Sequence, residues 1–288
     1  MRLFGFAVLS ALAFSVASPV IADAPVAGER YEVQRTARAK SQSSDGSSSS
    51  SNDRDRIEVR VIATGPEGIE FEYDLPQSAT AENRAKVWQF PARILRPANG
   101  GAPKLLNAAE LEQRLDPWLK LGGWDRRACG QWIFTWNAFK IECDPQSVLE
   151  TVAAFDLQPP KLRAGELYLL PGAAAPGVLR QVKSKAGKAT FAANLAIDPE
   201  QVRNELAETD VVVGQIMREP KSIEVTRAER AKMQITGSMT VTFEADGAGQ
   251  VLQRQVVIRI ELIDAAGVRE DRTNTETLER IPLPPVKY

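Results

Sequence analysis

Apolar and polar residues alternate along the first and last thirds of the chain. In the segment RIEVRVIA, residues 56–63, Ile57, Val59 and Val61 fall on one face of an extended strand and the charged residues fall on the other. The segment IEFEYDLP, residues 69–76, repeats this alternation after a turn rich in glycine and proline. The pattern predicts an N-terminal β-hairpin with one buried face and one solvated face.

A longer alternating region fills the C-terminal third. Residues 239–270 contain three strand-like runs separated by turn residues at 246–247 and 266–267, and residues 272–281 form a final run rich in threonine. A further strand is expected at 31–40. We therefore expect the N-terminal hairpin and this C-terminal meander to share one antiparallel sheet.

The middle of the chain has helical periodicity instead. Leu111, Leu115 and Leu119 recur every four residues and so share one helical face. They follow Asn107, which begins a capping-box-like start, while Pro117 predicts a kink or a break in this helix.

Residues 82–121 as a whole favour helix. Further helices are expected after the Asp-Pro pairs at 144–145 and 198–199, where aspartate caps the helix and proline occupies its first turn. For residues 207–218 the β-branched side chains favour a strand while the spacing allows a helix, and both stay open. The pattern predicts an α+β fold that is mainly antiparallel sheet, with a helical, disulfide-stapled insert at 97–158 that covers or edges the sheet.

The first 22 residues have the composition of a secretory signal peptide. A positive charge precedes an apolar run that is shorter than the roughly 20 residues of a membrane-spanning helix, and small residues follow. Cleavage is expected after Ala22, with Ala17 and Ala24 as alternatives. Residues 23–288 then form a single exported domain, periplasmic or secreted, that does not span the membrane. Within it, the polar segment 41–53 predicts a flexible serine-rich loop.

The amino-acid composition excludes several classes of catalytic and metal site. The chain has no histidine, which removes the imidazole of a Ser-His-Asp arrangement and of most zinc and copper sites. Its 36 basic and 37 acidic residues nearly balance, so no nucleic-acid partner is expected. No cofactor is expected either, because phosphate-loop, dinucleotide and calcium-loop patterns are missing from the sequence. Glu70, Glu72 and Asp74 alternate along one strand and are interpreted as its solvated face rather than as an acid–base pair.

The two cysteines of the chain, Cys129 and Cys143, frame the segment CGQWIFTWNAFKIEC. An even cysteine count in an exported protein predicts a disulfide between them. If the segment is an antiparallel hairpin closed by this bond, paired positions sum to 272. Alternation then places Ile133, Phe139 and Ile141 on the disulfide side of the hairpin.

The opposite side of the hairpin is the candidate binding surface. It carries aromatic residues, and Lys140 lies opposite Trp132 as a candidate cation–π partner. Two interpretations stay open: this side packs beneath a neighbouring helix, or it is open and contacts a ligand or partner. The candidate binding residues are Trp118, Trp124, Trp132, Phe134, Trp136 and Lys140.

These patterns favour a non-catalytic exported protein that binds a ligand or associates with the cell envelope. The order of its elements is similar to that of the small periplasmic carriers of lipoproteins, which place helices across a curved antiparallel sheet. That similarity concerns the fold alone, since no sequence motif accompanies it. An apolar ligand, a glycan or another envelope protein is the expected partner. The alternative functions are a carboxylate-dependent hydrolase acting on glycans, which needs two acids across a cleft, and a structural subunit of an envelope assembly.

Overall fold

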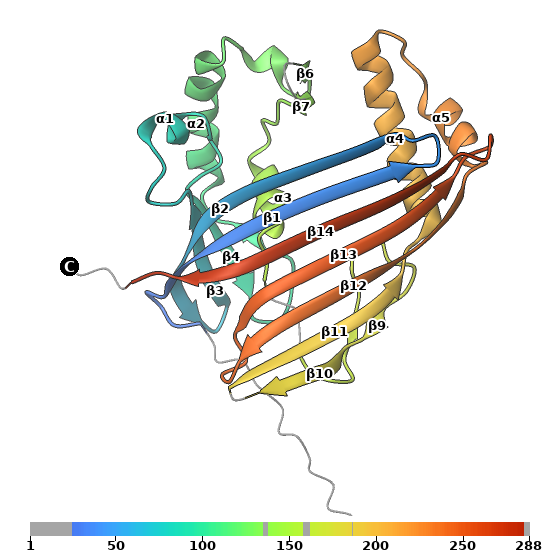
Figure 1. Ribbon diagram of the computed structural model, residues 1–288. Coiled ribbons are helices and arrows are strands. Elements are labelled where there is room, and N and C mark those ends of the chain that lie inside the picture. Colours follow the sequence, from blue (N-terminus) through green and yellow to red (C-terminus); the bar gives the residue numbers. More distant parts are fainter. Residues whose placement is uncertain (1–24, 135–137, 158–161, 186, 285–288) are drawn as a thin grey trace, which may run out of the picture.

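The computed structural model describes residues 25–134, 138–157, 162–185 and 187–284, and one large antiparallel sheet lies at its centre (Figure 1). Within the described residues, ten strands are joined in the order β10-β11-β12-β13-β14-β1-β2-β3-β4-β5. They are β1 (Arg30–Ser43), β2 (Ser48–Gly65), β3 (Gly68–Asp74), β4 (Ala92–Pro97), β5 (Lys104–Leu105), β10 (Arg180–Lys185), β11 (Lys188–Ala196), β12 (Gln234–Asp246), β13 (Val251–Ile263) and β14 (Arg269–Pro282).

Helices and two short ribbons complete the described structure. The helices are α1 (Ala81–Ala85), α2 (Ala108–Leu121), α3 (Val148–Ala153), α4 (Pro199–Met217) and α5 (Ile223–Arg230). The ribbons pair β6 (Trp132–Phe134) with β7 (Ala138–Lys140), and β8 (Leu167–Tyr168) with β9 (Gly177–Val178). This composition confirms the predicted α+β fold, mainly antiparallel sheet with a helical, disulfide-containing middle region.

The two ends of the chain meet in the middle of the sheet. Strand β1 pairs with β14 without interruption from Tyr31–Pro282 to Ser43–Glu270. The N-terminal hairpin and the C-terminal meander therefore belong to one sheet, as the alternation of apolar residues predicts. Pairing between positions more than 200 residues apart makes this ladder the contact that joins the two halves of the sheet.

The serine-rich segment 41–53 was expected to be a loop, and that expectation is wrong for most of it. Strand β1 continues to Ser43 and β2 starts at Ser48, so only residues 44–47 turn between them. The physical reason is that backbone hydrogen bonds form the ladder and need no apolar side chain. Strand β14 supports β1 on its other side over the same stretch.

Strand β2 has a partner on both sides over only part of its length. Its pairing with β3 begins at Glu58 and ends at the turn between Gly65 and Gly68. In the part of the chain that the structure describes, residues 48–57 therefore pair only with β1 and leave one edge free.

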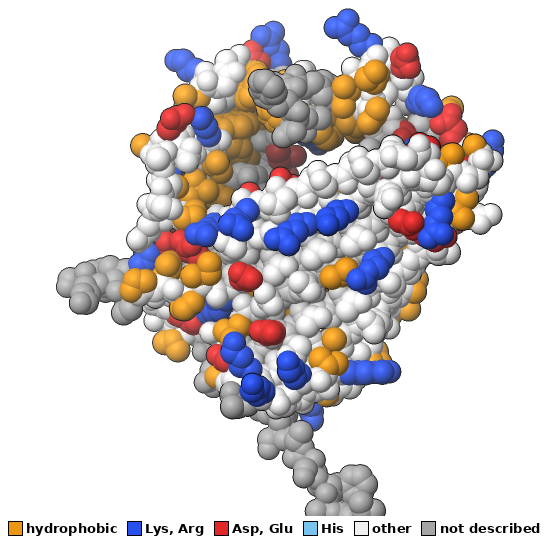
Figure 2. Space-filling view, in the orientation of Figure 1, with side chains coloured by type: hydrophobic (Ala, Val, Ile, Leu, Met, Phe, Trp, Pro, Cys, Tyr) orange, Lys and Arg blue, Asp and Glu red, His pale blue; other side chains and the backbone are white. Residues whose placement is uncertain are grey.

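Alternation gives the sheet two different faces. On the concave face, side chains such as Val33, Ile57, Val241 and Phe243 are almost fully buried and belong to one hydrophobic cluster. Helix α3 contributes to that cluster through Val148 and Val152, and α2 and α4 lie toward opposite ends of the curved sheet (Figure 1). The convex face carries mostly polar side chains and contacts solvent (Figure 2).

Helix α2 begins differently from the capping box that was expected. The side chain of Asn107 accepts no hydrogen bond from a backbone N–H of the first turn; it accepts from the backbone N–H of Arg93 at 2.9 Å and donates to the carbonyl of Pro91 at 3.1 Å and to the carboxylate of Glu110 at 3.3 Å. The buried asparagine thus fastens the helix to β4. The helix also continues through Pro117, where a kink or a break was expected, so the break is wrong; Leu115 and Leu119 are both buried and hold the helix against the core.

Two further segments bear on expectations from the sequence: one expectation is wrong, and one open choice between helix and strand is decided. Residues 92–97 form strand β4, although 82–121 favoured helix as a whole; Ala92 and Ile94 alternate with exposed residues and are buried on the sheet. Residues 207–217 are helical, the outcome that their spacing allowed, and Gly214 permits a close approach of the turn at 219–221. Tertiary packing therefore outweighs the β-propensity of the valines there.

Helix α2 offers a direct test of which of its faces is buried. The substitution Leu115→Ala should lower the free energy of unfolding by about 2–5 kcal/mol, because it opens a cavity in the core. The matched variant Leu121→Ala, in the same helix but 69 % exposed, should cost less than about 0.5 kcal/mol. Urea denaturation measures both, and equal losses would contradict the assigned orientation.

Candidate binding site

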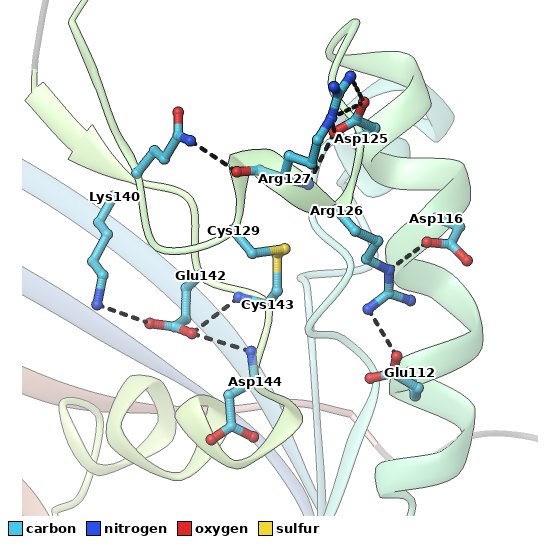
Figure 3. The surroundings of a disulfide bond; sticks show 11 residues. Glu112, Asp116, Asp125, Arg126, Arg127, Cys129, Lys140, Glu142, Cys143 and Asp144 are labelled. Carbon is cyan, nitrogen blue, oxygen red and sulfur yellow. Dashed lines mark hydrogen bonds and ion pairs between the residues drawn. A yellow bond between two sulfur atoms is a disulfide. The ribbon is translucent and has the colours of Figure 1, made fainter.

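The two cysteines form the predicted disulfide, with Cα atoms 5.6 Å apart. The hairpin that it closes has the predicted register, since Trp132 pairs with Lys140, Ile133 with Phe139 and residue 134 with 138. Figure 3 shows the bond at the base of the hairpin, beside the start of α3. The bond links residues 14 positions apart and closes the hairpin covalently.

Ion pairs tie the base of the hairpin to α2. The guanidinium of Arg126 contacts Asp116 at 2.5 Å and Glu112 at 2.8 Å, both on that helix (Figure 3). On the other side of the disulfide, the carboxylate of Glu142 accepts from the backbone N–H groups of Cys143 and Asp144. The insert is therefore fixed at its base by charge-assisted contacts as well as by the covalent bond.

The faces of the hairpin differ in part from the expectation. Ile141 is fully buried, as predicted for the disulfide side, but Phe139 on the same side is 38 % exposed. Trp132, on the opposite side, is 36 % exposed. Lys140 lies 3.9 Å from Glu142, and arginines elsewhere make cation–π contacts. The expected Lys140–Trp132 contact stays a prediction; the ladder places the two residues opposite one another.

A line of aromatic rings leads from the core to the hairpin. Ring centroids are 6.3 Å apart between Trp88 and Trp118, 6.0 Å between Trp118 and Trp124, and 6.1 Å between Trp124 and Phe139. These separations lie within the range of favourable aromatic contacts. Trp118 also donates its indole N–H to the carbonyl of Lys86 at 2.9 Å.

These contacts divide the candidate binding residues into those that are packed and those that are accessible. Trp118 and Trp124 pack against other rings, which favours the interpretation that they are part of the packing rather than of an open binding surface. Trp132 stays accessible. Trp136 and the side chain of Phe134 lie outside the described residues. Trp88, which sequence reasoning did not select, anchors the line at 5 % exposure.

A groove on the concave face is the second candidate. It encloses about 550 Å³ between the central strands and the segments that cross them, within the roughly 300–1,000 Å³ typical of small-molecule sites. Strands β1, β2, β13 and β14 form its floor, and the end of α3 and residues 168–171 form its roof. Its lining residues are Arg35, Ala37, Arg38, Ala39, Ser51, Asp53, Ala153, Tyr168, Leu170, Pro171, Arg254, Val256, Ile258, Asn274, Thr275 and Glu276.

Apolar side chains on β1 and β13 alternate with polar ones across the floor of the groove: Glu276 of β14 lies between Ala37 and Val256, and Asn274 lies between Ala39 and Ile258. Ala37 and Ala39 point to the concave face on β1, and Val256 and Ile258 do so on β13. Two alanines where the neighbouring strands carry larger side chains leave the space that the groove occupies. Leu170 closes the groove from above.

One end of the groove is polar. Glu276 lies between two arginines, accepting from Nε of Arg35 at 2.7 Å and from Nη2 of Arg254 at 2.9 Å. Arg254 also donates to the backbone carbonyl of Asp156 at 2.8 Å, and its buried Nε has no hydrogen-bond partner in the described part of the chain. Burial raises the pKa of Tyr168 at this end, so its phenol stays protonated at neutral pH.

Sequence reasoning did not find the groove. Its residues come from strands and loops spread from position 35 to position 276. The one local signal is the alternation of small residues at 37 and 39, where the sheet core would otherwise carry large ones.

The acids considered for a hydrolase are each paired with an arginine on the convex face. Glu70 and Glu72 pair across strands with Arg93 and Arg60, and Asp74 pairs with Arg84 of α1. Glu72 and Asp74 line a depression of about 410 Å³ together with these arginine partners, Arg60 and Arg84. Among the described residues, acidic and thiol groups form no cluster suited to a metal ion, and no helix is long and apolar enough to cross a membrane.

Tryptophan fluorescence tests which tryptophan is accessible to solvent, Trp132 in the hairpin or Trp88 in the core. In a Trp136→Phe background, Trp132→Phe should remove most of the emission that acrylamide quenches, because Trp132 is exposed. The matched Trp88→Phe variant should instead remove blue-shifted, shielded emission. If the two substitutions reduced quenching equally, the assignment of Trp132 as accessible would fail.

Removal of the disulfide tests how far it stabilises the fold. The double variant Cys129→Ser/Cys143→Ser should lose about 3 kcal/mol of unfolding free energy, as expected for a loop of this length. Urea denaturation measures the loss, and the reduced wild-type protein is the control that should match the variant. An unchanged midpoint would show that the hairpin is held by its other contacts alone.

Comparison with known proteins adds little. No protein-family model matches the chain, and no curated protein matches it. A solved structure described as lipid–protein interactions in lipovitellin aligns with 91 % of this chain at 8 % sequence identity and a TM-score of 0.43. The alignment covers 26 % of that protein, so this chain corresponds to about a quarter of its length. Such a TM-score is too low to establish a shared fold.

Proposed function

We propose that this protein is a non-catalytic, exported binding protein that holds an apolar or amphiphilic small molecule in the concave groove. The groove itself is the observation that carries the proposal. It combines a volume of about 550 Å³ with apolar side chains on β1, β13 and the roof and with polar side chains beside them, and small-molecule sites likewise place a few polar groups within an apolar lining. Export is supported by the disulfide, a bond that persists mainly in oxidising compartments.

The distribution of side chains in the groove favours an amphiphile over a glycan. An apolar chain would lie on Ala37, Ala39 and Val256 and displace water from them, which is favourable in proportion to the area covered. A polar head at the other end would meet Arg35 and Arg254. Among the residues that the structure describes, Tyr168 is the sole aromatic side chain in the lining, and this part of the chain supplies no set of rings on which sugars could stack.

Native mass spectrometry of protein purified from its own host tests for the ligand. A co-purifying amphiphile that is released on denaturation is the expected result. Competition by a fluorescent fatty-acid analogue should then locate it. Detection of a glycan adduct instead would overturn the choice of ligand class.

A bulky substitution that fills the groove should weaken binding of the ligand. Ala37→Phe places a bulky ring on the floor and should weaken binding of a fluorescent fatty-acid analogue by roughly tenfold or more. The matched variant Thr36→Phe adds similar bulk to the same strand on the convex face and should leave affinity unchanged. Thermal unfolding checks that both variants fold. Equal affinities of the two folded variants would show that the ligand does not lie in the groove.

A further inference from the structure

The convex face of the sheet carries two kinds of arginine. Toward β3 and β4 its arginines are neutralised: Arg60 pairs with Glu72, and Arg93 pairs with Glu70. In the extended arm formed by β1 and β2, by contrast, some basic side chains are not neutralised. Arg38, Lys40 and Arg54 are exposed there, and within the described residues no carboxylate lies within ion-pair distance of them.

Register places these cations on one continuous surface. Arg54 lies opposite Thr36, and Lys40 lies opposite Ser50 on one side and Thr273 on the other. Since Arg38 and Lys40 are two residues apart on one strand, their Cα atoms are separated by roughly 7 Å. Arg259 on β13 continues the row beyond Thr273, and it too is exposed and outside every ion pair of the described residues.

The acids of the same arm point the other way. Asp53 pairs with Ala37, and Asp55 pairs with Arg35, so both carboxylates lie on the concave face. Asp53 and Asp55 therefore lie on the inner face, where Asp55 pairs with Arg35, while Arg38, Lys40 and Arg54 lie on the outer face, whose nearest acid along β14 is Asp271 beyond Thr273. Figure 2 shows the resulting row of Lys and Arg side chains along β2 and β1. A depression of about 320 Å³, lined mainly by threonine and glutamine, lies between Arg38 and Arg54.

Exposed apolar side chains stand beyond the same rim of the sheet. The apolar stripe of α4 starts with Val202 and Leu206, which pack on the core, and continues into Val213, Ile216 and Met217, which are exposed. Figure 2 shows hydrophobic side chains on this part of α4, across a hollow that lies beyond the edge of β2. Trp132 and Phe139 of the hairpin are also exposed.

We propose that this rim is a docking surface for a membrane that contains anionic phospholipids. An unpaired cation row next to exposed apolar side chains is the combination that binds membrane interfaces, where basic groups meet phosphates and apolar groups enter the acyl boundary. The apolar part argues against a nucleic acid or an acidic glycan as the occupant. The inference does not depend on a ligand in the groove, and it places the groove, which reaches Ser51 and Asp53 on β2, beside the lipid surface.

Vesicle co-sedimentation tests the proposal. The mature protein should bind vesicles of phosphatidylglycerol and phosphatidylcholine, bind pure phosphatidylcholine far less, and release as salt screens the charges. Arg38→Gln/Arg54→Gln should weaken binding by roughly 25-fold, at about fivefold for each basic residue. The control Arg60→Gln/Arg93→Gln makes the same change in net charge on the same face but removes paired arginines, so it should bind like the wild type.

A separate experiment tests the role of the exposed apolar residues at the end of α4. Ile216→Ser/Met217→Ser should weaken binding to the anionic vesicles by roughly fivefold, whereas Val182→Ser, on exposed strand β10 at the far end of the sheet, should not. Equal binding to anionic and neutral vesicles, or equal loss in both arginine variants, would overturn the proposal. So would tight binding to a soluble anionic polysaccharide without vesicle binding. These results are separate from the groove assay, which uses a soluble ligand and no membrane.

Discussion

The antiparallel ladder between β1 and β14 is the interaction on which the architecture depends. It joins strands from opposite ends of the chain over the whole length of both, and so turns a hairpin and a meander into one curved sheet. Once this register is set, every side chain on the central strands is assigned to one face. The apolar set faces the helices, and the polar set faces solvent.

The same assignment produces both surfaces for which we propose a role. On the concave face, alanines at 37 and 39 leave a space that the crossing segments roof over. On the convex face, the alternate positions of the same strand carry Arg38 and Lys40. The small and the charged residues of β1 thus act on opposite sides of one backbone, and a register shift of one residue would exchange them.

Sequence patterns predicted the parts of this fold that are decided locally. Period-two alternation marked the hairpin and the meander, the Asp-Pro starts marked two helical segments, and the cysteine spacing set the register of the small hairpin. The misses were decided by distant contacts. Strand β4 and the serine-rich part of β2 have weak local signals and become strands because neighbouring strands pair with them. The side-chain oxygen of Asn107 does not cap a backbone N–H of α2, because it accepts from the backbone N–H of Arg93 instead. The groove could not be predicted, since it exists only after six segments meet: four strands, the end of α3 and residues 168–171.

The free edge of β2 gives the serine-rich segment a purpose that its composition alone does not reveal. An unpaired strand exposes a row of backbone donors and acceptors that could recruit another chain and lead to edge-to-edge aggregation. Serines, with Asp53, Arg54 and Asp55 among them, supply low β-propensity and charge along that row. A stretch too polar to build a core is thus well suited to leave part of an interior strand unpaired on one side without inviting a strand from a second molecule.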